Sequence, residues 1–484
     1  MRFSAFRKLL ALLLIAPLSG IAQNLPDLGD VADASLSESQ ERVFGKRIMQ
    51  EVRSDRAYVE DAELNDYINA LGNRLVQSAD SGPRQFEFFL LKDDSINAFA
   101  LYGGFIGIHT ATVTTSQSES ELASVLGHEI SHVLQRHIAR QIAGQKGAAI
   151  ASLAALAVAI LAARGNSSSQ APEAALATAS ALNIQSQLDY TREHESEADR
   201  TGLTLLQRAG FDVRGMVSFF ERLWRANRHN DSKAPGYLRT HPLTTERIAD
   251  LQNRVDSIPA RHVADSVDYQ FAHAKLAALA GSPTEAVDLF RNLIAEKTVR
   301  RTRADAYGLA LALKRSREFA AAEKELASIR SVPSLNAWIE LLAAEIKRDK
   351  KQFAEALSIT RTALKTFPDS RALFYSQIAT LYDLGQIDAA LAALTERLRN
   401  IQDDPALYTL QARGYSLKRK NLAMHRATAE AYYLRGNLTG AVEQLELAVK
   451  AKDGDFYEQS GAEARLRQLK AEHERSKKDE KKER

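Results

Sequence analysis

The feature that most limits how this chain can fold is a short alanine-containing sequence motif that recurs through its second half. The last alanine of each copy is spaced from the next by 36, 34, 34 and 51 residues: Ala286, Ala322, Ala356, Ala390 and Ala441. About 34 residues accommodate two helices and a turn, and such a unit buries its apolar face only by stacking on its neighbours. We therefore expect residues 265–470 to form an α-solenoid.

This period, with small residues where two helices cross, resembles that of tetratricopeptide repeats. Tyr382 to Gly385 and Tyr433 to Gly436 supply the aromatic-to-glycine turn expected between paired helices. The last interval is one and a half repeats, which indicates a helix shared between neighbouring units or an irregular insertion. An unrelated helical bundle is the alternative. The mixed-charge residues 471–484 are expected to form a frayed, solvated tail.

The first half of the chain mixes helical and strand-like patterns. Residues 38–76 carry apolar side chains mostly three and four positions apart, which predicts a pair of helices. Residues 86–91 are strand-like. Residues 98–101 and 105–110 flank Gly103-Gly104, which is the pattern of a β-hairpin. A small sheet should follow the first helices.

Two further helices are expected in this half. Ser118 and Glu121 form a capping-box pattern that opens a strongly periodic helix. Residues 173–209 read as one long helix that ends at Gly210. The fold class is therefore mainly α with a small β-sheet, and the N-terminal domain should span residues 23–260.

The N-terminus has the pattern of a secretory signal peptide. Basic residues precede an apolar run from Leu9 to Pro17, and small residues lead to a cleavage point near Ala22, which makes residues 1–22 the removed segment. A retained anchor is the alternative, but the run is shorter than the roughly 20 residues that cross a bilayer. We expect an exported protein, soluble or peripheral to a membrane.

Composition excludes several classes of function. The chain has no cysteine, which excludes thiol catalysis, disulfides and thiolate zinc sites, so any metal must be held by histidine and carboxylate. Its 64 lysines and arginines against 61 aspartates and glutamates give a formal charge of +3. This balance argues against nucleic acid as a partner.

The segment His128-Glu129-Ile130-Ser131-His132 lies inside the helix that Ser118 opens. Its two histidines project from one helix face about 6 Å apart, which lets both bind one zinc ion. Glu129 beside them could take a proton from the zinc-bound water and return it to the leaving amine. The pattern predicts a metalloprotease with one Zn²⁺ per chain. A purely structural zinc is disfavoured because it would not need Glu129.

Several carboxylates between residues 193 and 199 compete to be the third ligand. Glu195, Asp199, Gly202 and Leu206 share one stripe of the expected helix, and Gly202 would let another helix approach closely. We take this stripe as the metal-facing side. Glu195 is then the ligand, and Asp199 the acceptor that orients a zinc-bound imidazole.

The remaining candidates are expected to stay outside the metal site. Glu193 and Glu197 point away from the stripe and should be solvated, and His194 should be a surface residue. His137 lies off the zinc face, five positions after His132. The other histidines lack ligand spacing: His109, His229, His262, His273, His425 and His473.

A second apolar stretch, residues 147–163, has 17 uncharged residues and is mostly alanine. A membrane crossing here would put the two histidines and Glu195 on opposite sides of the bilayer. We therefore expect a buried or flap-like helix over the site, with a lipid-contacting surface helix as the alternative.

The motifs at His128 to His132 and at Glu195 to Asp199 resemble those of a known family of gluzincins. These are the exported relatives of the membrane protease HtpX and the CAAX prenyl endopeptidases. The resemblance implies a gluzincin-type zinc metalloprotease domain.

The resemblance also implies roles for two other segments. One segment matches the family's edge strand, which is thought to bind an extended substrate by β-augmentation: Asn97, Ala98, Phe99, Ala100, Gly103 and Gly104. A plain structural hairpin is also compatible with these residues. Thr240-His241-Pro242 with Arg247 matches a loop whose histidine can take the fourth zinc position and hold the enzyme latent.

The family implies a periplasmic zinc endopeptidase that acts in quality control or assembly of outer-membrane proteins. Unfolded or misassembled outer-membrane proteins would be its clients, the β-barrel assembly machinery a partner, and the repeats the docking domain. The alternative is a chaperone or adaptor in which the repeats act and the zinc site is largely latent.

Overall fold

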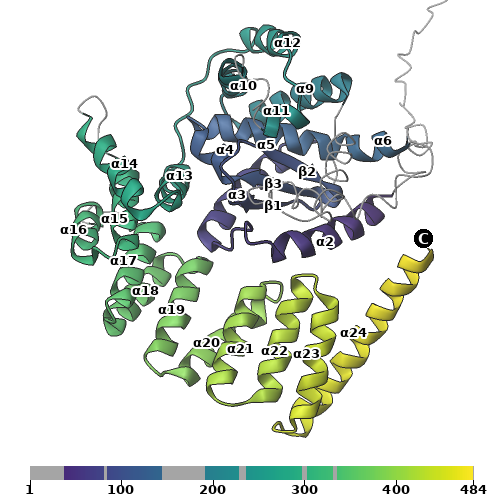
Figure 1. The fold of residues 1–484 in the computed structure, drawn as a ribbon, viewed down its shortest axis with the longest axis vertical. Helices are drawn as coiled ribbons and strands as arrows, with labels where there is room; N and C mark the ends of the chain where they lie inside the picture. The colour runs from purple at the N-terminus through teal and green to yellow at the C-terminus, as the bar shows by residue number, and fades with distance from the viewer. Residues whose placement is uncertain are drawn as a thin grey trace, which may run out of the picture.

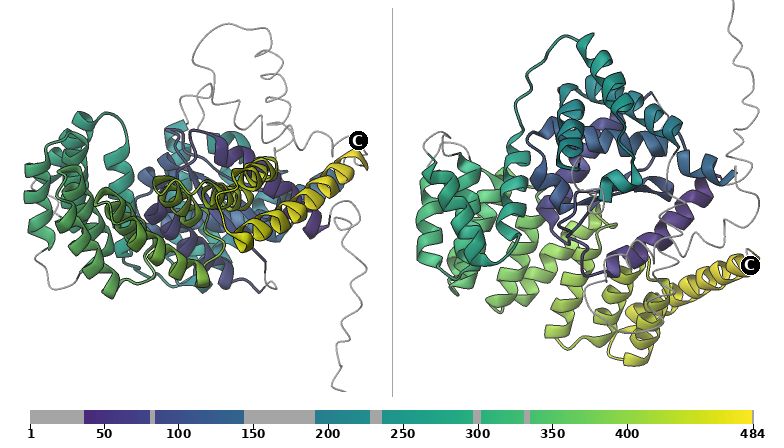
Figure 2. Two further views of the ribbon diagram at one scale, coloured as in Figure 1. Left: turned by 90° about the horizontal axis from the view of Figure 1, so that it is seen from below. Right: turned by 45° about the horizontal axis from the view of Figure 1, so that its top comes forward.

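The computed structural model describes residues 37–80, 84–143, 191–227, 236–296, 302–330 and 335–482. Within these ranges a helical half with a small sheet is followed by an array of helices, as expected (Figure 1, Figure 2). The expected signal peptide, residues 1–22, and the apolar stretch, residues 147–163, lie outside them. No described helix has both the length and the apolar character needed to cross a bilayer.

The expected pair of N-terminal helices is confirmed as α2 (Glu38–Ser54) and α3 (Ala62–Gln77). Ser37 and Gln40 form a full capping box at α2, and the Asp61 side chain caps α3. Each helix buries one apolar stripe, and α3 packs against the sheet and the central helix. The two helices form the base of the N-terminal half.

The sheet has three strands in the order β1-β3-β2. The strands are β1 (Glu87–Leu91), β2 (Ala98–Leu101) and β3 (Phe105–His109). The expected hairpin is confirmed, because β2 and β3 pair antiparallel through the short 3-10 turn η1 (Tyr102–Gly104). β1 pairs in parallel with the other side of β3, which leaves β2 at the edge of the described sheet.

The central helix is α5 (Glu119–Leu134), and it is buried on nearly all sides. Ser118 caps it as expected, since its hydroxyl accepts the Glu121 N–H at 3.2 Å. The other half of the expected capping box is wrong. The Glu121 carboxylate accepts the Gln117 N–H at 2.7 Å and pairs with Arg222 at 2.6 Å, because a neighbouring helix supplies a guanidinium that the local sequence does not show.

Helix α9 (Arg192–Ala209) carries the second motif. The expected helix over residues 173–209 is wrong at Thr191, whose backbone is extended at ψ 157° and whose hydroxyl caps α9. Residues 173–190 lie outside the described ranges. The expected end is confirmed, because Gly210 takes the left-handed conformation at φ 79°.

Gly202 lets α9 pack directly on α5, as its place in the stripe predicts. A Cβ atom on Gly202 would lie only 3.1 Å from the His128 backbone nitrogen. Five further described helices complete this half: α4 (Thr110–Thr115), α6 (His137–Ala143), α10 (Arg214–Asn227), α11 (Gly236–Thr240) and α12 (Thr245–Asp256).

The second half is an arc of antiparallel helices that follow one another in sequence order (Figure 1). The first six are α13 (Val267–Leu279), α14 (Pro283–Ala295), α15 (Arg303–Arg315), α16 (Phe319–Arg330), α17 (Ala337–Asp349) and α18 (Phe353–Thr366). The last six are α19 (Arg371–Asp383), α20 (Ile387–Asn400), α21 (Pro405–Leu417), α22 (Asn421–Leu434), α23 (Leu438–Ala451) and α24 (Phe456–Lys482).

Two details of the array bear on the sequence expectations. Helices α21 and α22 both lie between the helices that carry Ala390 and Ala441, so the long interval contains one helix more than a regular repeat. Helix α24 continues to Lys482, so the frayed end expected from residue 471 is wrong over the described residues. Each residue added to an existing helix forms one more backbone hydrogen bond, and the Lys, Glu and Arg residues at the end of α24 have a high helix propensity.

The array curves around α2 and α3 (Figure 1, Figure 2). Lys275 of α13 pairs with Glu63 at 2.7 Å and also contacts Asp61. Arg371 of α19 pairs with Asp66. The contact continues beyond these two pairs, because Arg435 reaches Glu60 at 3.5 Å. Helices α5, α9 and α11 lie on the side of the sheet away from α19 to α23 (Figure 1).

Candidate metal centre

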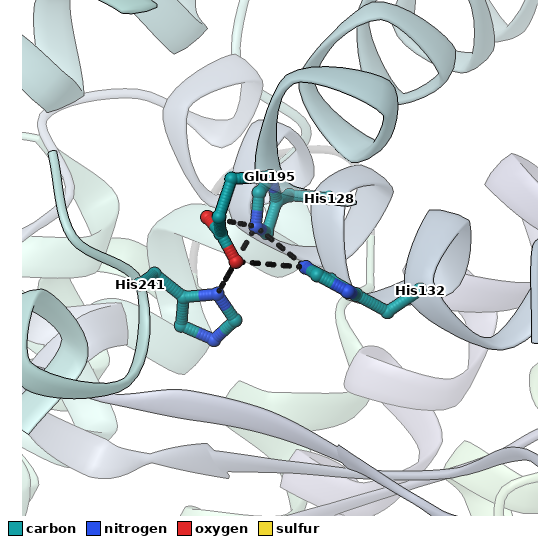
Figure 3. Close-up of side chains that lie close together, drawn as sticks. All are labelled: His128, His132, Glu195 and His241. Atoms are coloured by element: carbon teal, nitrogen blue, oxygen red, sulfur yellow. Dashed lines mark hydrogen bonds and ion pairs between the residues drawn. The ribbon is translucent and has the colours of Figure 1, made fainter. Parts of the chain in front are cut away.

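Helix α5 brings His128 and His132 together because residues four apart lie on one helix face. Their Nε2 atoms are 3.0 Å apart and both rings are buried. Glu195 of α9 and His241, which follows α11, complete the group (Figure 3). The four donor atoms lie within 4.8 Å of one another, and no other such group occurs in the part of the chain that the structure describes.

The donor atoms that contact one another are spaced nearly as they would be around a tetrahedral metal ion. Glu195 Oε1 lies 3.4 Å from His132 Nε2, and Glu195 Oε2 lies 3.5 Å from His128 Nε2. His241 presents Nδ1, which lies 2.9 Å from Glu195 Oε1 and 3.3 Å from His128 Nε2. Ligand atoms placed tetrahedrally about 2.0–2.1 Å from zinc would be about 3.3 Å apart. Imidazole and carboxylate donors at this spacing fit zinc.

Asp199 and Arg247 contact the His128 and Glu195 side chains and hold them in place. Asp199 Oδ1 lies 2.9 Å from His128 Nδ1, as expected of a residue that orients this imidazole. Arg247 donates from Nε and Nη2 to the two Asp199 oxygens, each at 2.8 Å. Its Nη1 atom lies 2.7 Å from Glu195 Oε2. One guanidinium therefore fixes both carboxylates of the Glu-x-x-x-Asp motif.

The electrostatics of the group favour a cation, because burial lowers the pKa of His128 but the carboxylates of Glu195 and Asp199 outweigh it and raise this pKa to about 10. Burial raises the pKa of Glu195, but the charges of His241 and His128 outweigh it and hold this pKa well below its usual value. Burial also raises the pKa of Asp199, but contacts with His128 and Arg247 lower it overall. Burial lowers the pKa of His132 to about 3, so its ring stays neutral, as a metal ligand must.

Glu129 is fully buried beside the group. Its Oε1 atom lies 3.4 Å from His241 Nε2, and neither carboxylate oxygen has a hydrogen-bond partner among the described residues. Burial raises the pKa of Glu129 against the attraction of His241 and His128. A carboxylate with a raised pKa is suited to accept a proton and pass it on near neutral pH.

Tyr237 positions His241, and the sequence reasoning missed it. The Tyr237 N–H donates to the Ile96 carbonyl at 3.0 Å, just before strand β2, and the His241 N–H donates to the Tyr237 carbonyl at 2.8 Å. The two rings stack with centroids 4.7 Å apart. The sequence signal that could have indicated this contact is the spacing of four residues between Tyr237 and His241, which one helical turn brings together.

The expected substrate strand divides into an edge and a turn. Asn97 uses its backbone groups internally, donating to Thr112 at 2.9 Å and accepting from His109 at 2.9 Å. In an antiparallel ladder alternate residues face outward, so Ala98 and Ala100 present their backbone groups at the edge.

Two other residues expected on this strand belong to its turn. Gly103 and Gly104 have φ of 71° and 83°, and a Cβ on Gly103 would lie 2.5 Å from the Arg42 Cα. Phe99 points into the core and packs edge-on against Phe89.

Three residues expected to be uninvolved lie behind His132. His137 is outside the ligand group, as expected, but it is buried and its Nδ1 lies 2.9 Å from His132 Nδ1. Glu197 was expected to be solvated, yet it contacts His137 Nε2 at 3.2 Å. His194 stacks on His137 with centroids 4.4 Å apart instead of lying free on the surface. Glu193 is exposed, as expected.

The other described histidines stay outside the group, as their spacing predicts: His109, His262, His273, His425 and His473. His229 lies outside the described ranges.

Comparison with known proteins extends these observations. Residues 62–255 match the model of peptidase family M48, and residues 347–414 match a tetratricopeptide repeat. The M48 match contains all four donor residues together with Glu129, Asp199 and Arg247. The N-terminal half is therefore a metallopeptidase, and the helical array contains tetratricopeptide repeats.

Three bacterial relatives are similar to the chain. The beta-barrel assembly-enhancing protease of Escherichia coli is 35% identical over 94% of this chain and 93% of its own. That of Yersinia pestis is 34% identical over 97% of this chain and 98% of its own. A Vibrio cholerae protein named "Putative beta-barrel assembly-enhancing protease" is 43% identical over 57% of this chain, and the match spans only 58% of that relative. Similarity along nearly the whole of two relatives means that this chain belongs to the family of beta-barrel assembly-enhancing proteases.

Proposed function

We propose that the protein is a zinc-dependent endopeptidase of the periplasm that acts in quality control and assembly of outer-membrane proteins. The observation that carries the proposal is the buried His128, His132 and Glu195 group with Glu129 beside it. The descriptions of the full-length relatives support the link to β-barrel assembly. The sequence pattern of residues 1–22 supports export to the periplasm.

In this proposal His128, His132 and Glu195 hold one zinc ion. An ion held there would polarise the scissile carbonyl as a Lewis acid. Glu129 takes a proton from the attacking water and delivers it to the leaving amine, which its buried carboxylate with a raised pKa can do. Asp199 holds the His128 ring, and Arg247 holds Asp199 and Glu195 in place.

Substrate binds as an extended segment along the free edge of β2. Ala98 and Ala100 offer outward backbone groups there. Burial raises the pKa of Glu129, and the Ala100 N–H opposes this rise. An added strand on this edge therefore passes beside the proposed proton carrier. Main-chain pairing explains how an endopeptidase could accept unfolded segments of varied sequence.

His241 keeps the site closed until substrate arrives. Its Nδ1 fills the fourth donor position, which the substrate carbonyl or the attacking water needs. The Tyr237 N–H donates to the Ile96 carbonyl, which lies on the same edge as the outward backbone groups of Ala98 and Ala100. A peptide that pairs along the edge as far as Ile96 competes with this anchor and so helps to release His241.

The repeats dock clients or the β-barrel assembly machinery. They form a curved array held against α3 by Lys275 and Arg371, so a bound client stays near the peptidase half. Unfolded or misassembled outer-membrane proteins are the proposed clients.

The test is degradation of an unfolded outer-membrane β-barrel polypeptide by the purified mature chain with added zinc. The His241→Ala variant should cleave it faster than the unchanged chain, and Glu129→Gln in the same background should abolish cleavage. His425→Ala, a substitution in the repeats, is the control for loss of a histidine as such. No cleavage by a zinc-loaded His241→Ala variant would overturn the peptidase proposal.

A second candidate function is a chaperone or adaptor with a largely latent site. The observation in its favour is that His241 closes the donor group. If the adaptor role is correct, Glu129→Gln leaves maturation of a client barrel unchanged. If the peptidase role is correct, the same substitution stops degradation of the misassembled client.

A further inference from the structure

The turn between α5 and α6 places His137 behind His132. Arg136 has a positive φ of 54°, which is uncommon for a residue with a side chain. Its guanidinium holds this turn by donating to Glu41 of α2 at 3.1 and 2.8 Å, and the pair is largely buried. The turn brings His137 back against the end of α5, on the side of His132 that faces away from the donor group.

His137 there links His132 to a carboxylate. The Nδ1 atoms of His132 and His137 are 2.9 Å apart, and His137 Nε2 lies 3.2 Å from Glu197 Oε2. Arg140 pairs with the same Glu197 oxygen at 3.1 Å. The His137 side chain is fully buried, whereas that of Glu197 is 42% exposed. The three side chains form a continuous polar line that leads outward from the metal position.

The proton positions along this line follow from which nitrogen atoms must accept a hydrogen bond and which can donate one. His132 Nε2 faces Glu195 and His128, so it must be unprotonated to bind a metal, and the ring carries its proton on Nδ1. His132 Nδ1–H then donates to His137 Nδ1, which must be the acceptor. The His137 proton is left on Nε2, where it donates to Glu197. In this arrangement each of the two N–H groups along the line meets an acceptor.

We propose that His137 is a positioning residue that, with Glu197, fixes the Nδ1–H tautomer and the ring orientation of His132. The proposal rests on the proposed zinc site. It assigns His132 the kind of support that Asp199 gives His128 directly at 2.9 Å. In the case of His132 an imidazole stands between the ligand and the carboxylate, and Arg140 orients that carboxylate. Partners of this kind typically change metal affinity by about 10- to 100-fold.

The test is the rate at which the zinc-loaded mature chain releases zinc to a chromogenic chelator. His137→Leu removes the acceptor and should raise this rate about 10- to 100-fold. His137→Asn keeps an oxygen near the position of Nδ1 and should restore much of the slow release. Glu197→Ala should give an intermediate rate, and Glu197→Gln, which keeps an acceptor, a smaller change. His425→Leu is the matched control and should release zinc as the unchanged chain does.

Unfolding temperatures of the zinc-free variants separate positioning from general stability. A positioning role requires that Leu and Asn at residue 137 differ in zinc release while their zinc-free forms unfold alike. Should His137→Leu fail to fold, the Glu197 pair carries the test at a partly exposed side chain. Equal zinc release by the Leu and Asn variants, or by both Glu197 variants and the unchanged chain, overturns the proposal. Failure of the unchanged chain to bind zinc would instead overturn the proposed function.

Discussion

The Nδ1 atom of His241 lies 2.9 Å from the Oε1 atom of Glu195, although 46 residues separate them in the chain. Glu195 is on α9, which packs on the buried central helix, whereas His241 follows the five-residue helix α11. One donor of the group is therefore carried by a long helix that packs on α5, and the other follows a five-residue helix that Tyr237 anchors to Ile96. Movement of α11 alone would open the group and leave His128, His132 and Glu195 in place.

The contact between α11 and Asn97 gives a way to displace α11. A Cβ atom on Gly236 would lie 3.2 Å from Asn97 Nδ2 and 3.3 Å from its Cγ, so Gly236→Ala should push α11 outward. We expect several-fold faster cleavage of an unfolded polypeptide at saturating zinc. Gly461→Ala is the control, since its Cβ would have no neighbour closer than 3.6 Å. An unchanged rate for Gly236→Ala would contradict this account of the closed site.

The contact of α9 with α5 gives a way to disturb the ligands themselves. Gly202→Ala places a Cβ atom 3.1 Å from the His128 backbone nitrogen, which cannot yield as a flexible side chain can. Overpacking of this kind costs about 1–3 kcal/mol of unfolding free energy. Zinc affinity should fall as well, because His128 and Glu195 are carried by the two helices that separate. Denaturant unfolding and chelator competition measure the two effects, and wild-type values in both would refute the prediction.

The start of α5 should make stability depend on pH. Burial raises the pKa of Glu121, but hydrogen bonds from Arg222, the Gln117 N–H and Ser218 outweigh it and lower the pKa below its usual 4.5. A lowered pKa in the folded state stabilises the fold above pH 4.5, and this contribution is lost as the pH falls through the lowered value. Glu121→Gln should therefore cost about 1–3 kcal/mol at pH 7.

The measurement is denaturant unfolding of both chains between pH 7 and pH 3. The difference between them should shrink as the pH drops below the usual carboxyl pKa. Glu463→Gln, at an exposed position of α24, should track the unchanged chain throughout. A difference that stays constant with pH would show that the ionised form of Glu121 is not what stabilises α5.

Most of what the sequence predicted correctly depends on residues close together in the chain. Two histidines four apart share a face of any helix, so the placement of His128 and His132 needed no knowledge of the fold. The same periodicity put Glu195, Asp199 and Gly202 on one buried stripe. The period near 34 residues predicted the helical array, because a repeated unit must stack on its own copies.

Tertiary structure decided which side chains meet across elements. Glu121 turns to Arg222, and His137 reaches both His132 and Glu197, because α10, α6 and α9 are brought against α5 by packing that no local pattern records. The parallel pairing of β1 with β3 and the anchoring of Tyr237 to Ile96 likewise join segments far apart in the chain. Local periodicity determines which face of a helix is buried, whereas the partner on the other side of that face is set only when the core closes.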